Sequence, residues 1–322
     1  MVRVSAGLPT GMEGLTYPIP FSDPENVIRI AQAAEKFGYD SVWGNDHMTT
    51  QHYVRAEFPV PPRFWEPLIT YAFILGETKT LKVGTGILVL PMRHDIVVTA
   101  KQIATLDHFG KGRLEVGVGI GAYREEFLAL QPSTKMDRGD IVDEGLQALR
   151  LLFSERVASF DGRFYKFKDV ELYPKTLQKR IPIYVGGNNE NNIRRTVQWG
   201  DGWLPAGMHV DRLRAGVKKL REMAERAGRD PKAIDVCPQF VVHVGKTHEA
   251  AVESLIEGWL CRTRASTRSP GENSSPSASV YPSFALEMWI VPSGAPGTVR
   301  WLVAAARIVT IAIALFTSST RP

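Results

Sequence analysis

Short apolar segments alternate with amphipathic helical segments through the first 256 residues of this 322-residue chain. The segment at 81–91, LKVGTGILVLP, is almost continuously apolar, which is typical of a parallel strand covered on both faces. An earlier segment is predicted to be a helix, because Ser22 and Asp23 can cap its start and Pro24 suits its first turn. The alternation predicts an α/β fold in which crossover helices connect parallel strands.

The pattern predicts seven strands and the helices between them. The strands are expected at 2–8, 40–47, 81–91, 113–121, 181–187, 201–207 and 234–245. The helices are expected at 24–37, 65–77, 96–109, 141–153, 188–199 and 211–227, with a hairpin arm at 161–167. This favours a TIM-type (β/α)8 barrel whose last strand and helices are missing or replaced by a divergent tail. The alternative is an open doubly wound sheet, but the first loop, TGMEG, does not match its glycine-rich dinucleotide loop.

The composition changes near residue 257. All 14 lysines and all 14 aspartates lie before this residue, whereas serine and proline supply 16 of the residues at 257–322. The stretch at 263–282 has no helical or strand period and is typical of disordered sequence. We therefore divide the chain into a barrel domain at 1–256 and a divergent, partly disordered tail at 257–322.

Two hypotheses explain the tail. It is either a flexible extension particular to this lineage or the product of a shifted reading frame near residue 256. A frame shift would replace lysine and aspartate by arginine, serine and proline together, so we favour it. Translation of the other frames of the gene decides between the two hypotheses.

Composition and charge exclude several classes of protein. The two cysteines, Cys237 and Cys261, form no CxxC pair, which argues against a disulfide framework or a zinc site and favours a reducing, cytoplasmic location. The net charge is +5, of which the tail supplies +3, and no stretch has the aromatic and basic pattern of a nucleic-acid-binding surface. The apolar run at 299–316 is interrupted by arginines and is too short to span a bilayer. We expect neither nucleic acid nor a membrane as a partner.

In a TIM-type barrel, functional residues gather at the carboxyl ends of the strands. Asp46 and His47 follow the second strand, and a histidine there can exchange a proton near neutral pH. The structural alternative is a histidine satisfied by a loop carbonyl. Gly86 and Ile87 interrupt the apolar third strand, where a glycine indicates a bulge, a close approach by a ligand or simple packing.

Two further strand ends carry glycines. Gly117, Gly119 and Gly121 alternate along the fourth strand, so one of its faces has no side chains and leaves room for a flat ring or a neighbouring strand. Gly186, Gly187, Asn188 and Asn189 lie between the fifth strand and a helix. Free backbone N–H groups at such a helix start can bind a phosphate, although a tight turn with an asparagine cap is the common alternative.

Several basic residues lie near the strand ends and can form a rim for an acidic cofactor tail. A solvated charged surface is the default explanation for each of them. They are Arg93, Arg124, Lys135, Arg138, Arg194 and Arg195.

The order of these segments resembles the luciferase-like monooxygenase superfamily, in particular its branch of probable coenzyme F420-dependent oxidoreductases. Four segments carry the resemblance. They are AEKFGYDSVWGNDH at 34–47, LKVGTGILVLPMRHDIVVTAKQIATLDHFGKGRLEVGVGIGAYREEF at 81–127, IPIYVGGNN at 181–189 and GDGWLP at 200–205. The resemblance covers nearly the whole barrel-like region.

The resemblance implies hydride transfer between F420 and a small organic substrate, with reduced FMN and monooxygenation as one alternative. The other alternative is an inactive, truncated remnant of the family. It implies that His47 is catalytic and lies beside the cofactor ring together with Asp46, and that Gly86–Ile87 is a strand bulge with a non-proline cis peptide. It further implies that Ala122 and Tyr123 lie near the ring and that the segment at 186–188 (Gly186, Gly187, Asn188) binds the cofactor phosphate.

The chain also departs from its relatives. Related F420-dependent sugar-phosphate dehydrogenases place a glutamate proton donor where this chain has Ala122, which argues against that activity although Glu125 and Glu126 stand nearby. The family's eighth strand is not recognisable after residue 256, and its loss would leave a bare strand edge. Dimers are common in the family, so a homodimer is a further possibility.

Overall fold

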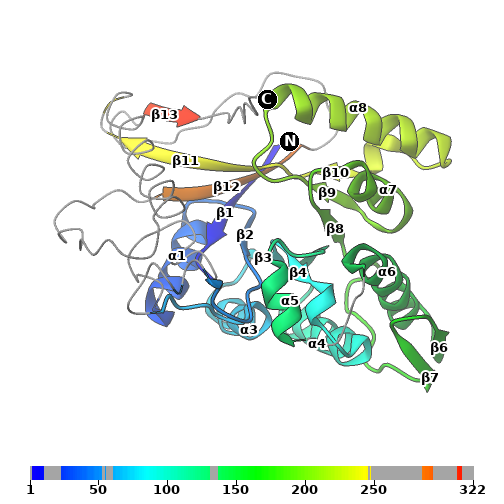
Figure 1. The fold of residues 1–322 in the computed structure, drawn as a ribbon. Coiled ribbons are helices and arrows are strands. Elements are labelled where there is room, and N and C mark those ends of the chain that lie inside the picture. Colours follow the sequence, from blue (N-terminus) through cyan, green and yellow to red (C-terminus); the bar gives the residue numbers. More distant parts are fainter. Residues whose placement is uncertain are drawn as a thin grey trace.

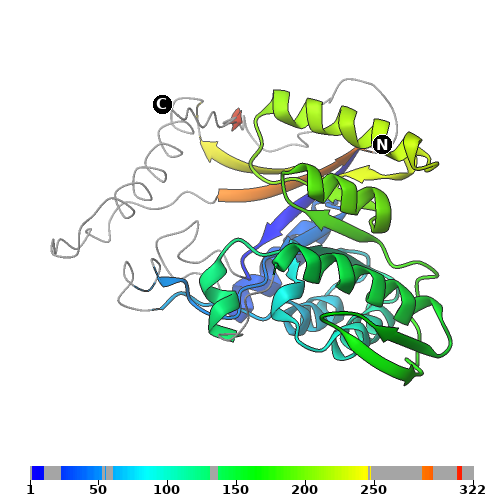
Figure 2. The same cartoon turned by 45° about the vertical axis from the view of Figure 1, so that its right-hand side comes forward.

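The computed structural model describes residues 2–10, 23–52, 55, 61–130, 137–245, 247, 285–292 and 310–313. Figures 1 and 2 show a strongly curved sheet with helices packed along its outer face. The sheet neighbours follow the chain in the order β1, β2, β3, β5, β8, β9, β10, and each of these pairs is parallel. This succession of parallel neighbours is the arrangement of a (β/α) barrel.

All seven expected strands are present, and two of them are interrupted. The uninterrupted strands are β1 (Val2–Leu8), β2 (Ser41–Gly44), β5 (Leu114–Gly119), β8 (Ile183–Gly186) and β9 (Gly202–Leu204). The third expected strand divides into β3 (Lys82–Thr85) and β4 (Leu88–Val89), and the seventh into β10 (Asp235–Val236) and β11 (Gln239–Gly245). The first interruption contains Gly86 and Ile87 and the second contains Pro238, which has no N–H to donate.

The helices lie on the connections between strands, as expected. They are α1 (Pro24–Lys36), α3 (Pro67–Glu77), α4 (Ile96–Phe109), α6 (Arg138–Ser154), α7 (Glu190–Trp199) and α8 (Val210–Arg226). The expected cap is present, because Asp23 Oδ1 accepts a hydrogen bond from the Asn26 N–H at 2.7 Å. The hairpin arm is longer than predicted and consists of β6 (Ala158–Asp161) and β7 (Lys166–Val170). Within the described residues, no helix is both long and apolar enough to cross a membrane.

Three short elements were not expected from the sequence. The helix α5 (Arg124–Leu130) follows β5, and the 3-10 turns η1 (Leu90–Met92) and η2 (Pro231–Ala233) complete the set. The segment of α5 has two glutamates in its first turn and lacks the long apolar stripe by which the other helices were predicted.

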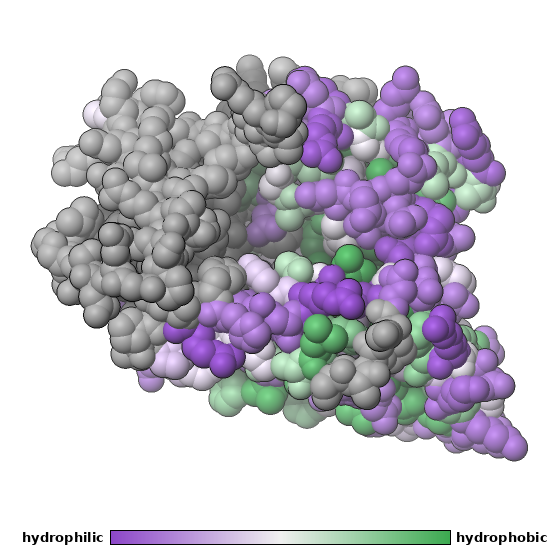
Figure 3. All heavy atoms as spheres, in the orientation of Figure 1, coloured by the Kyte–Doolittle hydropathy of each residue, from purple (hydrophilic) through white to green (hydrophobic). Residues whose placement is uncertain are grey.

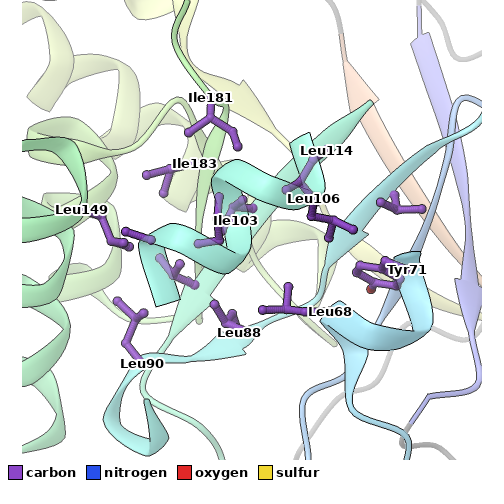
Figure 4. Close-up of a cluster of buried hydrophobic side chains, with 14 of the residues drawn as sticks. Leu68, Tyr71, Leu88, Leu90, Ile103, Leu106, Leu114, Leu149, Ile181 and Ile183 are labelled. Atoms are coloured by element: carbon purple, nitrogen blue, oxygen red, sulfur yellow. The ribbon is translucent and has the colours of Figure 1, made fainter. Parts of the chain in front are cut away.

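The two faces of the sheet have separate cores. Alternate residues of β8 illustrate this, because Ile183 and Val185 join the outer core whereas Tyr184 joins an inner cluster. Figure 4 shows part of the outer core between the sheet and the helices α3, α4 and α6. The inner cluster consists of Trp43, Tyr184, Leu204 and Cys237, with Ile87 packed against it.

A strand of the tail occupies the position of the missing eighth strand. β12 (Ala285–Pro292) lies between β1 and β11 and runs antiparallel to both, and β13 (Thr310–Ile313) pairs with the other side of β11. The prediction of a bare edge at β1 is therefore wrong, because the backbone of β12 supplies hydrogen-bond partners along it. The tail replaces the eighth strand with one of opposite direction, and the division of the chain at residue 256 stays a prediction.

Candidate functional site

The ends of β2 and β3 are joined at the point where β3 stops. The Gly86 N–H donates to the Gly44 carbonyl at 2.8 Å, and the Val89 N–H donates to Asp46 Oδ2 at 2.9 Å. The peptide bond between Gly86 and Ile87 is cis, which confirms the backbone form that the family resemblance implied. This bulge lies at the carboxyl end of the parallel sheet, where a barrel of this type builds its site.

The Ile87 side chain fills space left by glycines on neighbouring strands. A Cβ atom added to Gly119 would overlap Ile87 Cδ1, and one added to Gly186 would overlap Ile87 Cγ2. The other two glycines of the alternating set are closed in the same way, because Thr85 faces Gly117 and Val89 faces Gly121. The flat-ring explanation of these glycines is therefore wrong, since the neighbouring strand occupies their room.

His47 lies after β2 in a cluster of mostly buried side chains. Its Nδ1 lies 2.9 Å from Glu126 Oε2 and 2.9 Å from Gln51 Nε2. Its ring centroid is 5.3 Å from that of Phe64 and 5.8 Å from that of Tyr123. The side chain is 11 % exposed, so the ring is shielded by protein but still reachable.

Asp46 has protein partners for both of its carboxylate oxygens. Besides the Val89 N–H, it binds the Arg93 guanidinium at 2.9 Å, and Arg93 also binds Glu66 at 2.9 Å. Burial raises the pKa of Asp46, although Arg93 and the Val89 N–H act in the opposite direction. The carboxylate is fully buried, so its position fits a role in holding the bulge in place beside His47.

Tyr123 and Ala122 follow the end of β5. Tyr123 lies against the His47 ring, and Ala122 is exposed to solvent. The structure thus brings His47 together with Tyr123, and it brings Ile87 together with Gly186. The Gly44 carbonyl and the Asp46 carboxylate, which accept hydrogen bonds from the bulge and from the residues after it, connect the two groups.

The loop after β8 is held by its own polar groups. Gly187 has φ +122°, which favours glycine, and its carbonyl accepts from Trp203 Nε1 at 2.8 Å. The Asn188 side chain donates to the Ala206 carbonyl at 2.6 Å and accepts from the Ala206 N–H at 2.9 Å. Asn189 caps α7 by accepting from the Asn192 N–H at 3.1 Å. The asparagine cap of the common alternative is therefore present, and the Asn188 side chain clamps this loop to the one after β9.

A polar pocket of about 500 Å³ lies between the end of β5 and the starts of α6 and α7. Four of the six predicted rim residues line it: Arg124, Arg138, Arg194 and Arg195. Its other lining residues are Ile120, Asp137, Gly139, Asp140, Asp143, Asn189 and Asn191. Of the remaining predicted rim residues, Arg93 is used in the ion pairs with Asp46 and Glu66, and Lys135 lies outside the described residues.

The four arginines differ in how they are neutralised. Arg194 and Arg195 share the carboxylate of Asp143, at 2.8 Å and 2.9 Å. Arg138 donates to the carbonyls of Ile120 and Gly121 at 3.3 Å and 3.0 Å. Burial and the nearby charge of Arg124 lower the pKa of Arg138. Arg124 has no ion pair among the described residues, although Asp137 and Asp140 also line the pocket. The four arginines of the lining exceed its three aspartates by one positive charge, near the N-terminus of α7.

Sequence reasoning assigned no role to Glu126, Gln51 or Phe64, which all contact His47. Glu126 stood out only as one of two glutamates after the fourth strand, and Gln51 carried no motif. The signal that could have found Glu126 is its place in the first turn of a short helix that follows a strand end. Within the described residues, no group of three histidine, cysteine, aspartate or glutamate side chains could hold a metal ion.

A sequence model described as luciferase-like monooxygenase matches residues 3–289 of this chain. The chain belongs to the luciferase-like monooxygenase family. The matched range covers every strand from β1 to β11 and most of β12. The family resemblance inferred from the four sequence segments is therefore confirmed.

Curated relatives within and around this family have different activities. An uncharacterized protein of Mycobacterium tuberculosis is 34 % identical over 183 residues, which are 55 % of this chain and 63 % of that protein. An F420-dependent glucose-6-phosphate dehydrogenase of Amycolatopsis mediterranei is 26 % identical over 72 % of this chain and 68 % of that protein. The alkanal monooxygenase alpha chain of Photorhabdus laumondii is 27 % identical over 74 % of this chain and 65 % of its own length. The chain spans less than two thirds of the length of the mycobacterial relative.

Two solved structures have a similar fold. An F420-dependent secondary alcohol dehydrogenase in complex with an F420–acetone adduct has a TM-score of 0.60 at 24 % identity, covering 66 % of this chain and 63 % of that chain. The long-chain alkane monooxygenase LadA has a TM-score of 0.63 at 20 % identity, covering 80 % of this chain and 69 % of that chain. At these identities the likeness establishes the TIM-type barrel.

Proposed function

We propose that this luciferase-like chain is an oxidoreductase that transfers a hydride between coenzyme F420 and a small organic substrate. The observation that carries the proposal is the segment from Ile120 to Glu126, which joins two parts of one strand-end region. At one end it lines the arginine-rich pocket through Ile120 and Arg124, and at the other it contacts His47 through Tyr123 and Glu126. A long cofactor with a ring and an anionic tail requires two such neighbouring environments.

The pocket fits the anionic part of this cofactor. Arg124 and Arg138 offer guanidinium groups, and the start of α7 beside Asn189 and Asn191 offers backbone N–H groups and the positive end of a helix dipole. The predicted phosphate segment at 186–188 directly precedes this helix start. We infer that Gly187 and the first turn of α7 bind the phosphate, and that Arg124 binds the acidic tail.

The ring would lie beside His47 and the bulge at Gly86–Ile87. A bound deazaflavin supplies a hydride donor or acceptor. The protein's own groups would shape one wall with the bulge, shield the ring with Phe64 and Tyr123, and present the His47 imidazole for a proton. We place sugar phosphates outside the substrate range, because Ala122 has no proton to give where the related dehydrogenases have a glutamate.

Reduced FMN is the alternative cofactor. The relative named alkanal monooxygenase alpha chain aligns with 74 % of this chain, and the phosphate of FMN would suit the same arginine pocket. The two cofactors have different absorption spectra, so purified protein can be incubated with each one, freed of unbound cofactor and measured. A retained deazaflavin band is the expected result, a retained flavin spectrum supports the alternative, and retention of neither would overturn both.

We also propose that the chain forms a homodimer through α3 and α4. These helices pack against each other and expose apolar side chains, with Ile69 and Phe73 of α3 being 64 % and 65 % exposed and Val98 of α4 being 51 % exposed. Figure 3 shows hydrophobic side chains along the lower part of the face that it presents, where α3 and α4 lie in Figure 1. Large exposed apolar surfaces of this kind are typical of protein interfaces.

A further inference from the structure

His47 offers one ring nitrogen to two different partners. Glu126 Oε2 and Gln51 Nε2 both lie 2.9 Å from Nδ1. A neutral imidazole nitrogen either donates or accepts, so Nδ1 cannot accept from the amide and donate to the carboxylate together. Gln51 Oε1 is buried without a hydrogen-bond partner among the described residues. Rotation of the amide by 180° resolves the conflict at Nδ1 and gives Oε1 a partner, since Oε1 then accepts from an Nδ1–H that is shared with the carboxylate, while Nε2 gives up its 3.5 Å contact with the Thr49 carbonyl.

We propose that Glu126 is a positioning residue that holds His47 in the tautomer with its proton on Nδ1. An ionised carboxylate can only accept hydrogen bonds, and the Glu126 side chain is 4 % exposed, so a missing donor could not be replaced freely by water. The second carboxylate oxygen accepts from the Thr49 N–H at 3.3 Å, which fixes the carboxylate relative to the loop of His47. Nε2 then carries the free lone pair of the ring.

The other groups around the ring do not compete for Nδ1. Phe64 and Tyr123 contact the ring through their own rings. Nearby charges have separate partners, because Glu125 binds the His52 N–H at 2.7 Å and the Asp46 carboxylate binds Arg93. Among the described residues, Glu126 is therefore the charged group that contacts the His47 imidazole.

The consequence for catalysis rests on the proposed function. With its proton on Nδ1, neutral His47 can accept a substrate proton at Nε2 and become an imidazolium whose charge Glu126 stabilises. The opposite tautomer could only donate at Nε2. Glu126 would thus decide in which direction His47 moves a proton, without touching the substrate itself.

The tautomer can be measured on the protein without any cofactor. Long-range 1H–15N NMR spectra distinguish a protonated from an unprotonated ring nitrogen, and the His47 signals are assigned by their loss in His47→Gln. At a pH where the imidazoles are neutral, we expect a protonated Nδ1 and an unprotonated Nε2. In Glu126→Leu both tautomers should be populated, whereas Glu125→Leu, which removes the neighbouring carboxylate, should leave the His47 signals unchanged.

Two results would overturn the proposal. One is a wild-type His47 with its proton on Nε2, and this test does not depend on any variant being folded. The other is a folded Glu126→Leu protein whose His47 tautomer is unchanged. If F420 turnover is found, Glu126→Leu should lower kcat by about 100-fold, the lower end of what a positioned acid–base group contributes, with KM nearly unchanged. A confirmed tautomer without any F420 binding would sink the proposed function and leave the role of Glu126 standing.

Discussion

Arg3 Nη1 lies 2.8 Å from Glu115 Oε1, across the amino-terminal ends of β1 and β5, which are not neighbours in the sheet. The same guanidinium binds Asp235 at 2.6 Å and the Tyr184 hydroxyl at 2.9 Å. This network ties together strands on opposite sides of the barrel at the end away from the proposed site. Burial lowers the pKa of Arg3, but Tyr184, Glu115 and Asp235 outweigh it and raise the pKa overall.

Removal of Arg3 should therefore destabilise the barrel. Arg3→Met leaves the Glu115 carboxylate, whose side chain is 3 % exposed, with the more distant Lys82 at 3.4 Å as its remaining ion-pair partner among the described residues. We expect the free energy of unfolding to fall by about 3 kcal/mol, as is usual when one partner of a buried ion pair is lost. Chemical denaturation measures the loss, and the double variant Arg3→Met/Glu115→Gln should recover part of it. An unchanged denaturation midpoint in Arg3→Met would contradict this account.

The lowered pKa of Glu35 predicts that the folded chain loses part of its stability in acid. Burial alone would raise the pKa of Glu35, but hydrogen bonds from the backbone N–H groups of Thr80, Leu81 and Lys79 outweigh it and lower the pKa from 4.5 to about 2. A pKa that is lower in the folded chain stabilises the fold above the unfolded value, so this contribution is lost as the pH falls from about 4.5 to about 2. Glu35→Gln should be less stable than wild type at neutral pH and should lose less stability over that range.

The matched control is Glu25→Gln, because Glu25 is an exposed glutamate on the same helix. Thermal unfolding followed by circular dichroism over this pH range provides the comparison. Parallel pH profiles for wild type and Glu35→Gln would show that Glu35 contributes nothing to acid stability.

The position of Arg124 in the arginine pocket predicts how strongly the cofactor binds and how binding depends on salt. It lines the arginine pocket without an ion pair among the described residues, so a bound anion can pair with Arg124 without breaking an existing ion pair. Arg124→Ala should weaken F420 binding by about 10-fold or more, since a hydrogen bond to a charged group contributes about 1.5–3 kcal/mol. The variant's affinity should also depend less on salt. Fluorescence titration of F420 measures both effects.

Arg156→Ala is the control for this titration, because Arg156 is 89 % exposed and does not line the pocket. Its affinity should match that of wild type. Equal losses in the two variants would mean that binding depends on overall charge and that the pocket has no special part in it.

The exposed apolar surface of α3 and α4 predicts the oligomeric state. Phe73→Glu places a charge in the proposed interface and should convert a dimer to a monomer of 35.8 kDa, as measured by light scattering after size-exclusion chromatography. Leu177→Glu provides the control, because Leu177 is an equally replaceable exposed apolar residue, 51 % exposed, outside these helices. A wild-type protein that is monomeric at high concentration would end the proposal.

Much of the fold followed from periodicity. The strand at 113–121 and the helix at 96–109 were found within a residue or two, because continuous apolar strands and striped helices leave clear patterns. The cis bond at Gly86–Ile87 was implied by the family resemblance and is present. The helix α5 was not predicted, because seven residues are too few to show an apolar stripe. The contact between Glu126 and His47 was therefore not predicted either.

The glycines of the fourth strand show where a local pattern was insufficient. Their spacing correctly indicated a strand face without side chains, but whether a ring or a neighbouring strand fills that face depends on what the third strand places there. The structure places Ile87 and Val89 against it. A residue's own neighbours along the chain contain no information about this.

By itself, the sequence determined the barrel architecture, the family and the order of the strand ends, because these depend on patterns repeated along the chain. Tertiary structure alone decided which charges meet. It paired Arg93 with Asp46, left Arg124 facing the pocket, brought Glu126 to His47 and placed β12 beside β1. The reason is that an ion pair or a strand pair forms between residues tens of positions or more apart, and its partners are chosen by the packing of the whole sheet.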